Sequence, residues 1–265
     1  MREPVRGWLF RGGVALLFGL LVLPLGIVVA TAFDASRAVV FPPTELSLRW
    51  FLELLESPTW LRSLGNSVVV AAGTSVLSTL VGVTAALGTR SMDGRYRTAA
   101  VGLAVVPLLV PGIVIGVTLL TFLSRFGLQQ SYPALVVAHS LWATPLTFSV
   151  MQAAFARFDW QLHEAALDLG ASRVRAFVSV VVPEVRASLA VAALVAFIVS
   201  LQEFVMALFL SGPDTRTVPV QAWNSLRQSL DPLVSVVSTI LVVAVVALVL
   251  LGSALVGLER LAAET

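Results

Sequence analysis

Six stretches of 22 to 31 residues, almost free of Asp, Glu, Lys and Arg, limit what this chain can fold into. Five contain no such residue, and the sixth, between Arg186 and Asp214, contains only Glu203. A helix rises about 1.5 Å per residue, so each stretch is long enough to cross roughly 30 Å of hydrocarbon. Only 12% of the residues are charged, against about 25% in soluble domains, which indicates an integral membrane protein.

The stretches predict an all-α membrane fold built as a single domain over residues 1–265. Pro107, Pro111 and Pro145 predict kinks, which membrane helices tolerate. Glycines such as Gly82, Gly112 and Gly116 predict close contacts between helices. We expect six transmembrane helices, over residues 10–33, 63–89, 98–123, 133–156, 187–211 and 232–258.

The composition excludes several kinds of activity. All 17 basic residues are arginines, and a phosphate loop of the Walker type needs a lysine, so the chain cannot itself be a P-loop ATPase. There is no cysteine, and His139 and His163 are not spaced as metal ligands, so we assign no metal ligand and expect His139 to be a core residue. A net charge of +2, without a basic patch, argues against nucleic acid as a partner. Enzyme motifs such as His-Glu-x-x-His and Gly-x-Ser-x-Gly are absent, so we assign no catalytic residue.

Arginines set the expected orientation. With the N-terminus in the cytoplasm, 11 arginines lie inside and six outside, which by the positive-inside rule places both termini in the cytoplasm. Segments 34–62 and 212–231 then lie outside, and loop 157–186 lies inside. Both outer segments carry apolar residues at helical spacing, either as amphipathic connectors or as a vestibule that receives a partner protein. These residues are Leu48, Phe51, Leu52 and Leu55, and Trp223, Leu226 and Leu230.

The cytoplasmic loop 157–186 has the pattern of a short helix followed by a corner. Asp159 is a suitable N-cap, Gly170 can take the left-handed conformation that ends a helix, and Ser172 can cap the next helix. One face of the short helix is apolar, because small or aliphatic residues recur there at helical spacing: Leu162, Ala165, Ala166 and Leu169. This face either packs on its own bundle or enters a cleft on a partner.

The same loop carries a longer motif, Glu164-Ala165-Ala166, Gly170, Val180 and Val182-Pro183. Its spacing is similar to the signature of the permease subunits of binding-protein-dependent ABC importers, with valines where the signature has Ile and Leu. The resemblance implies a type I ABC importer permease fold with a cytoplasmic coupling helix between helices 4 and 5. It also implies which residues act in ATPase coupling: Glu164, Ala165, Ala166, Leu169, Gly170 and Pro183.

The resemblance further implies a set of partners. ATP and Mg would be bound by a separate dimer of ATP-binding subunits, so no cofactor is expected in this chain. A soluble substrate-binding protein and a second, homologous permease would complete the importer in the bacterial inner membrane. Softer matches resemble the second permease of the spermidine/putrescine class, and these are Asn66-Ser67 and residues 200–205, 210–213 and 217–220.

Glu203 is the acid inside a membrane span, where an unpaired carboxylate costs several kcal/mol. It either pairs with a polar group across a helix interface or, with Ser200, Gln202 and Phe204, lines the substrate path. Polyamine permeases of this class often have an acid where this chain has Gln202. Only one carboxylate is available here, which argues less for a dication. The resemblance implies a small amine-containing solute, polyamine-like or related, with an amino acid derivative, a phosphonate or another small organic solute as the alternative. An ion-coupled secondary transporter is a further alternative, but it would not need the cytoplasmic motif.

Overall fold

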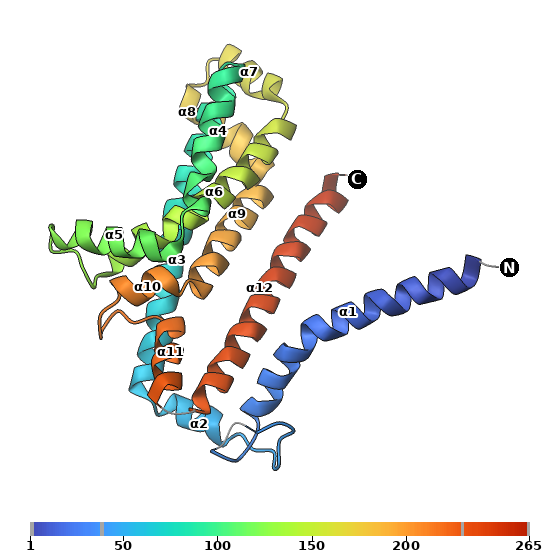
Figure 1. Ribbon diagram of the computed structural model, residues 1–265. Coiled ribbons are helices and arrows are strands. Elements are labelled where there is room, and N and C mark those ends of the chain that lie inside the picture. The colour runs from blue at the N-terminus through green and yellow to red at the C-terminus, as the bar shows by residue number, and fades with distance from the viewer. Residues whose placement is uncertain (1–2, 38–39, 229–230, 264–265) are drawn as a thin grey trace. The chain divides into compact units, whose positions relative to one another are not determined.

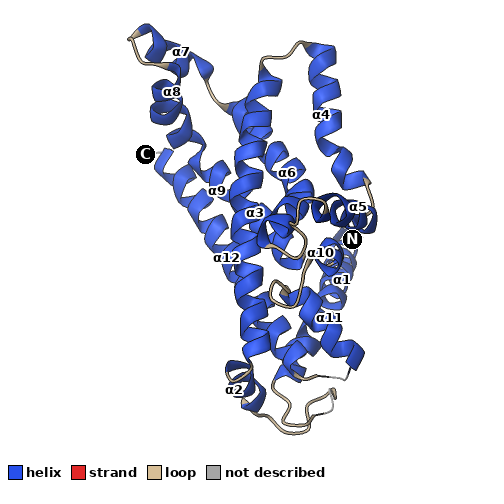
Figure 2. Ribbon diagram, turned by 90° about the vertical axis from the view of Figure 1, so that its left-hand side faces the viewer, coloured by secondary structure: helices blue, strands red, loops and turns tan. Residues whose placement is uncertain are grey.

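The computed structural model describes residues 3–37, 40–228 and 231–263, and the regular structure in these residues is helical, joined by loops, with one isolated β-bridge between Asp34 and Leu46 (Figures 1 and 2). The helices are α1 (Glu3–Ala32), α2 (Arg49–Leu55), α3 (Pro58–Arg90), α4 (Gly94–Leu109), α5 (Gly112–Ser124), α6 (Tyr132–Arg157), α7 (Trp160–Asp168), α8 (Arg173–Ala176), α9 (Val182–Gln202), α10 (Val205–Leu210), α11 (Val218–Gln228) and α12 (Leu233–Ala263). The all-α prediction is confirmed.

Five apolar helical stretches are long enough to cross a membrane: Phe10–Ala32, Pro58–Arg90, Tyr132–Arg157, Arg173–Gln202 and Leu233–Ala254. A sixth crossing is possible if α4 and α5, which meet at 92°, form one broken span. The stretch beginning at Arg173 is continuous because α8 and α9 are joined by a π-helical turn. The described spans therefore number five, or six with the bent pair.

The bend between α4 and α5 corrects the prediction of one helix over 98–123. Pro111 disfavours the helical conformation of the residue before it, and Val110 accordingly has extended backbone angles (φ −85°, ψ 127°). Pro111 also lacks the N–H that would bond to the carbonyl of Pro107 in a continuous helix. That carbonyl instead accepts from the indole of Trp142 at 3.1 Å, and from the backbone N–H of Val110 at a longer 3.4 Å. The proline thus breaks the span and a neighbouring helix satisfies the freed carbonyl.

A second break corrects the prediction of one helix over 187–211. Helix α9 ends at Gln202, Glu203 has extended backbone angles (φ −69°, ψ 121°), and α10 starts at Val205. No proline causes this break; its stabilising contacts come from the Glu203 side chain. The remaining predicted spans, 10–33, 63–89, 133–156 and 232–258, correspond to α1, α3, α6 and α12, whose ends differ from the predicted ones by up to seven residues.

Two compact units make up the chain; the prediction of a single domain stays a prediction. The first unit comprises residues 1–61 and 222–246. In it, the hydroxyl of Thr31 at the end of α1 donates to Ser235 of α12 at 3.2 Å. The predicted helix in segment 34–62 is present as α2, and the helix predicted around Trp223 as α11. Leu230 lies outside the described residues.

Asp34 organises the loop that follows α1. Its carboxylate accepts hydrogen bonds from the hydroxyls of Ser36 (2.6 Å) and Thr44 (3.2 Å), and its carbonyl accepts one from the Trp50 indole (2.8 Å). The Ser36 hydrogen bond is the main reason that the pKa of Asp34 lies below its ordinary value of 3.8, because it favours the ionised form. The connection from α1 to α2 is therefore a folded element.

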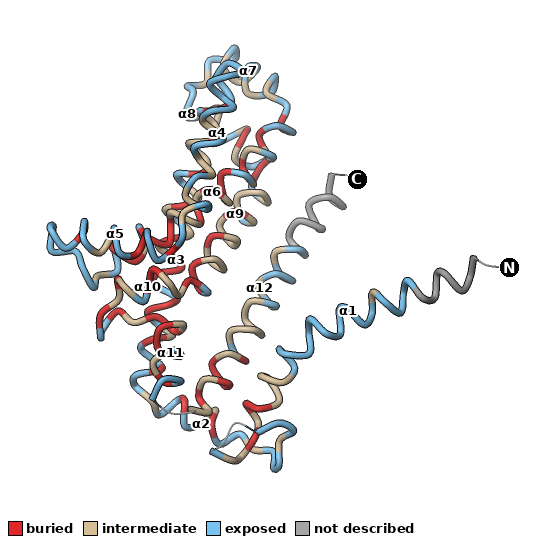
Figure 3. Tube along the Cα trace, viewed as in Figure 1, coloured by how far each residue is buried: buried red, intermediate tan, exposed pale blue. Residues whose placement is uncertain are grey.

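The second unit comprises residues 62–221 and 247–265 and is built around α6. Helix α6 packs against α9, α4, α10 and α5, and Figure 3 shows buried residues gathered along α6 and α9. Its largest buried side chains include Leu135, Phe148 and Met151, each at most 1% exposed. The predicted close contacts at Gly82, Gly112 and Gly116 are confirmed, since each glycine lies against a neighbouring helix.

The closest of these contacts generates a prediction. A Cβ on Gly82 would lie 2.8 Å from the backbone nitrogen of Phe148 in α6, and backbone cannot move aside as a flexible side chain can. We expect Gly82→Ala to lower the free energy of unfolding by about 1–3 kcal/mol through overpacking. Thermal unfolding of the purified protein in detergent measures this. Gly88→Ala, in the same helix with open space around it, is the control; equal melting temperatures would contradict the contact.

Candidate functional site

Loop 157–186 folds as its capping residues predict. The Asp159 carboxylate accepts a hydrogen bond from the backbone of Gln161 at 3.0 Å and begins α7. Gly170 ends this helical segment in the left-handed region, with φ +88°. The Ser172 hydroxyl then accepts from the backbone of Arg175 at 3.3 Å and begins α8. All three predicted roles are confirmed, and they shape an outward-projecting corner.

The apolar face of α7 is not used inside the chain. None of the residues of α7 is buried, and Leu162 and Leu169 are 51% and 90% exposed. Glu164, Ala165 and Gly170 are also exposed, and Ala166 is half-buried. Exposed leucines beside small alanines form a surface that another protein can approach closely, with the Glu164 carboxylate at its edge. Of the two interpretations open from the sequence, the geometry favours docking to a partner over packing on the chain's own bundle.

Pro183 lies where the loop enters the membrane span. It follows a π-helical turn over Phe177–Val181, in which the N–H of Val182 bonds to the carbonyl of Phe177. Because Pro183 has no N–H, it cannot continue the regular hydrogen-bond ladder, and proline is tolerated at the first turn of a helix. The motif proline therefore marks the transition from the loop to α9.

Glu203 fills the second helix break. Its two carboxylate oxygens accept hydrogen bonds from the backbone N–H groups of Met206 (2.8 Å) and Ala207 (3.0 Å), the first turn of α10. These groups have no helical partner, and an anion near a helix N-terminus is favoured. Glu203 is 4% exposed. The carboxylate thus satisfies backbone donors that the break would otherwise leave unpaired.

Three further side chains extend from this carboxylate across the bundle. His139 of α6 has its Nε2 atom 3.3 Å from Glu203 Oε2, but the two atoms form no hydrogen bond. Its Nδ1 atom forms a 2.7 Å hydrogen bond with Ser200 of α9, whose hydroxyl donates to Thr74 of α3 at 3.3 Å. His139, Ser200 and Thr74 are all buried. We call these four residues the polar cluster; it joins α3, α6, α9 and the start of α10.

Two of the four predicted path residues belong to the polar cluster, and two do not. Ser200 and Glu203 lie together in it, whereas Gln202 is exposed and Phe204 packs, half-buried, on the core that includes Met206. His139 is a core residue, as expected. Thr74 was missed, because a hydroxyl in an apolar helix gives no signal of its partner on another helix. Both uses of Glu203 that the sequence allows remain compatible with this arrangement.

A second polar group holds the segment between α10 and α11. The Asn66 amide of α3 donates to the carbonyls of Asp214 and Arg216, both at 2.9 Å, and accepts from the Tyr132 hydroxyl at 2.7 Å. Next to it, the Ser67 hydroxyl accepts from the backbone of Val218 at 2.8 Å. Asn66-Ser67 therefore ties one end of α3 to the loop 211–218, a role that sequence reasoning did not assign.

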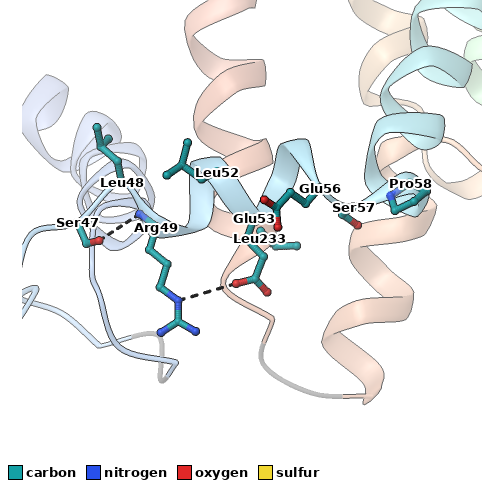
Figure 4. Close-up of a pocket in the computed structure, with 9 residues that line it drawn as sticks. All are labelled: Ser47, Leu48, Arg49, Leu52, Glu53, Glu56, Ser57, Pro58 and Leu233. Atoms are coloured by element: carbon teal, nitrogen blue, oxygen red, sulfur yellow. Dashed lines mark hydrogen bonds and ion pairs between the residues drawn. The ribbon is translucent and has the colours of Figure 1, made fainter.

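A cavity of about 960 Å³ opens beside α2 in the first unit (Figure 4). Figure 4 shows Arg49 reaching toward Glu53, with 4.0 Å between Arg49 Nε and Glu53 Oε2. Glu56 adds a second carboxylate, and Leu48 and Leu52 contribute apolar surface. The charged side chains that line the cavity, Arg49, Glu53 and Glu56, carry a net negative charge, and the leucines beside them are exposed.

Comparison with known proteins now identifies the family. Residues 78–258 match the family described as "Binding-protein-dependent transport system inner membrane component". This region contains the whole motif of Glu164-Ala165-Ala166, Gly170, Val180 and Val182-Pro183. The chain belongs to this family. It is a multi-pass membrane permease of the ABC importer class, with the type I fold that the motif implied.

Relatives and solved structures agree with this assignment. The spermidine/putrescine transport system permease protein PotC of Escherichia coli K12 is 24% identical over 89% of this chain and 90% of its own length. The putrescine permease PotI of the same strain is 28% identical, over 86% and 83%. A bacterial alginate ABC transporter matches at 17% identity with a TM-score of 0.70, over 95% of this chain and 94% of the other.

The Asn66 contacts generate a prediction. Asn66→Ala removes three hydrogen bonds in a buried place and leaves carbonyls of loop 211–218 without their donor, so we expect a loss of about 2–4 kcal/mol in unfolding free energy. Thermal unfolding of the purified protein tests this. The matched control is Asn224→Ala, at the half-buried asparagine of α11. A melting temperature unchanged from wild type in Asn66→Ala would show that these contacts add nothing.

Proposed function

We propose that this chain is the permease subunit through which an ABC importer passes a small, amine-containing solute into the cytoplasm. The observation that carries the proposal is the exposed α7 with its Gly170 corner, placed in the loop that bears the family motif. The docking residues would be Glu164, Ala165, Ala166, Leu169 and Gly170, with Pro183 setting where α9 departs.

The proposed energy source lies in other subunits. Since the chain has no lysine, it cannot form a Walker phosphate loop, so a dimer of ATP-binding subunits would bind ATP and Mg and close against α7. This requires loop 157–186 and both termini to lie in the cytoplasm, as the arginine distribution favours. The chain itself would then need no cofactor and would perform no catalysis.

Segments 34–62 and 212–231 would face the periplasm and receive a soluble binding protein. The folded loop around Asp34 and the charged cavity beside α2 support this placement, because they present ordered polar surface. A second, homologous permease would complete the pathway. The resemblance to the second permease of the spermidine/putrescine class favours a heterodimer, because that class pairs two different permeases.

The substrate proposal rests on Glu203 and on the two polyamine permeases among the relatives. Ser200, Gln202, Glu203 and Phe204 would border the path at the helix break. Both Glu203 oxygens accept backbone hydrogen bonds, so a cationic group would have to compete with Met206 and Ala207 for the carboxylate. With Gln202 beside it, one carboxylate is available, which suits a single ammonium group at this point.

The coupling assignment predicts that Gly170→Trp abolishes ATP-dependent uptake. Gly170 has φ +88° and open space around it, so tryptophan would both strain the backbone and block a docking surface. Gly127→Trp has the same strain (φ +67°) and equally open surroundings but lies between α5 and α6, and it should retain uptake.

Glu164→Arg should also abolish uptake, because it reverses the charge at the edge of the docking surface. Uptake of labelled putrescine and co-purification of the ATPase are the measurements; wild-type coupling in Gly170→Trp and Glu164→Arg would defeat the assignment.

The path assignment predicts that Glu203→Gln impairs uptake without loss of assembly. The amide keeps the shape of the carboxylate but removes the charge that would attract an ammonium group. It also weakens the α10 cap, since a hydrogen bond to a charged group contributes about 1.5–3 kcal/mol. Uptake per assembled complex and melting temperature are therefore measured together, with exposed Glu184→Gln in α9 as control. A lower melting temperature with unchanged uptake would assign Glu203 to capping alone.

A further inference from the structure

We propose that Arg90 and Trp160 form a clamp that fixes the coupling helix α7 to the inner end of α3, so that the two move together. Arg90 is thereby a positioning residue for the motion that α7 receives from the ATPase. This inference rests on the proposed function for its purpose, but the clamp itself is a property of this chain.

The clamp is a close contact between two helix ends. Arg90 is the last residue of α3 and Trp160 the first residue of α7. The guanidinium carbon of Arg90 lies 3.7 Å from the centroid of the Trp160 ring. Tryptophan is the best aromatic partner for a cation, and the planar guanidinium can stack on the ring. A cation in the last turn of α3 is also favoured by the helix dipole.

The Trp160 ring is fixed from its other sides. Its indole nitrogen donates to the carbonyl of Phe155 at 3.0 Å. The rings of Phe158 and Phe155 lie 5.0 Å and 5.9 Å from it, and both phenylalanines are buried. His163, one turn along α7, lies 5.8 Å away. An aromatic ring held at this many points gives Arg90 a defined surface to bind, so the contact is specific.

No carboxylate in the described part of the chain lies within 4.0 Å of the Arg90 guanidinium, so the ring is the partner that the structure gives it. Arg95, near the same membrane face, stacks instead on its own neighbour Tyr96 at 4.7 Å. That contact joins no separate elements. The difference makes Arg95 a suitable control for removing a charge without removing a clamp.

Helix α3 gives the clamp a mechanical consequence. It runs without a break from the clamp at Arg90 to Asn66, whose amide holds the loop 211–218. Midway, Thr74 contacts Ser200 of the polar cluster. On its other side, α7 continues through the Gly170 corner toward α8 and α9. A displacement of α7 would therefore reach α9 directly and, through Arg90, the far end of α3 as well.

The chain has no cysteine, so a pair of spin labels can be placed at will. Gly88→Cys at the inner end of α3 and Gln161→Cys in α7 are both exposed and report the distance across the clamp by pulsed electron paramagnetic resonance. In the importer complex we expect one narrow distance that is the same without nucleotide and with ATP plus vanadate. Arg90→Gln and Trp160→Leu should each broaden and lengthen it, and the double variant should add nothing further.

Conservative variants separate the clamp from a general loss of folding. Arg90→Lys and Trp160→Phe keep a cation and a ring, and should largely retain the narrow distance; Arg95→Gln should retain it fully. An unchanged distribution in Arg90→Gln, or a wild-type distance that changes with ATP and vanadate, would overturn the proposal. Failure of the proposed function is a different result: the wild-type permease would not retain an ATPase subunit, although its clamp distance in detergent stayed narrow.

Discussion

The constraint on which this structure depends is that backbone N–H and C=O groups inside a membrane have no water to bond to. Two predicted spans are nevertheless broken, at Pro111 and at Glu203. In each case a side chain supplies the missing partner: Trp142 donates to the carbonyl of Pro107, and the Glu203 carboxylate accepts from the first N–H groups of α10. Irregular backbone is therefore possible at these two places because Trp142 of α6 and Glu203 at the second break supply the hydrogen-bonding groups that it needs.

Helix α6 lies beside both breaks. It carries Trp142, which reaches the break between α4 and α5, and His139, which reaches the break between α9 and α10 through Ser200 and Glu203. Gly82 of α3 also packs directly against the backbone of α6. Replacing α6 residues would thus affect several spans together. The broken helices and the close contacts are parts of one packing arrangement.

Much of the fold was predictable because its signals are local. Span lengths follow from charge spacing, and Asp159, Gly170 and Ser172 define the corner between α7 and α8 through rules that involve only neighbouring residues. The break at Glu203 was not predictable, because no proline or glycine marks it. Nor were the partners of Thr74 and Asn66, since contacts between distant segments depend on how the helices pack. The site was accordingly foreseen at the loop and only in part within the membrane.

The polar cluster shows why an acid in a membrane span is an ambiguous signal. A carboxylate at such a place must have partners, and Glu203 has them in the backbone of α10. Capping of α10 and binding of a cation would use the same two Glu203 oxygens, so the two interactions would compete. If an ammonium group did bind, it would weaken the contacts that hold the start of α10. Glu203 would then link the presence of a cation to the geometry of the helix break, a connection that neither role alone would provide.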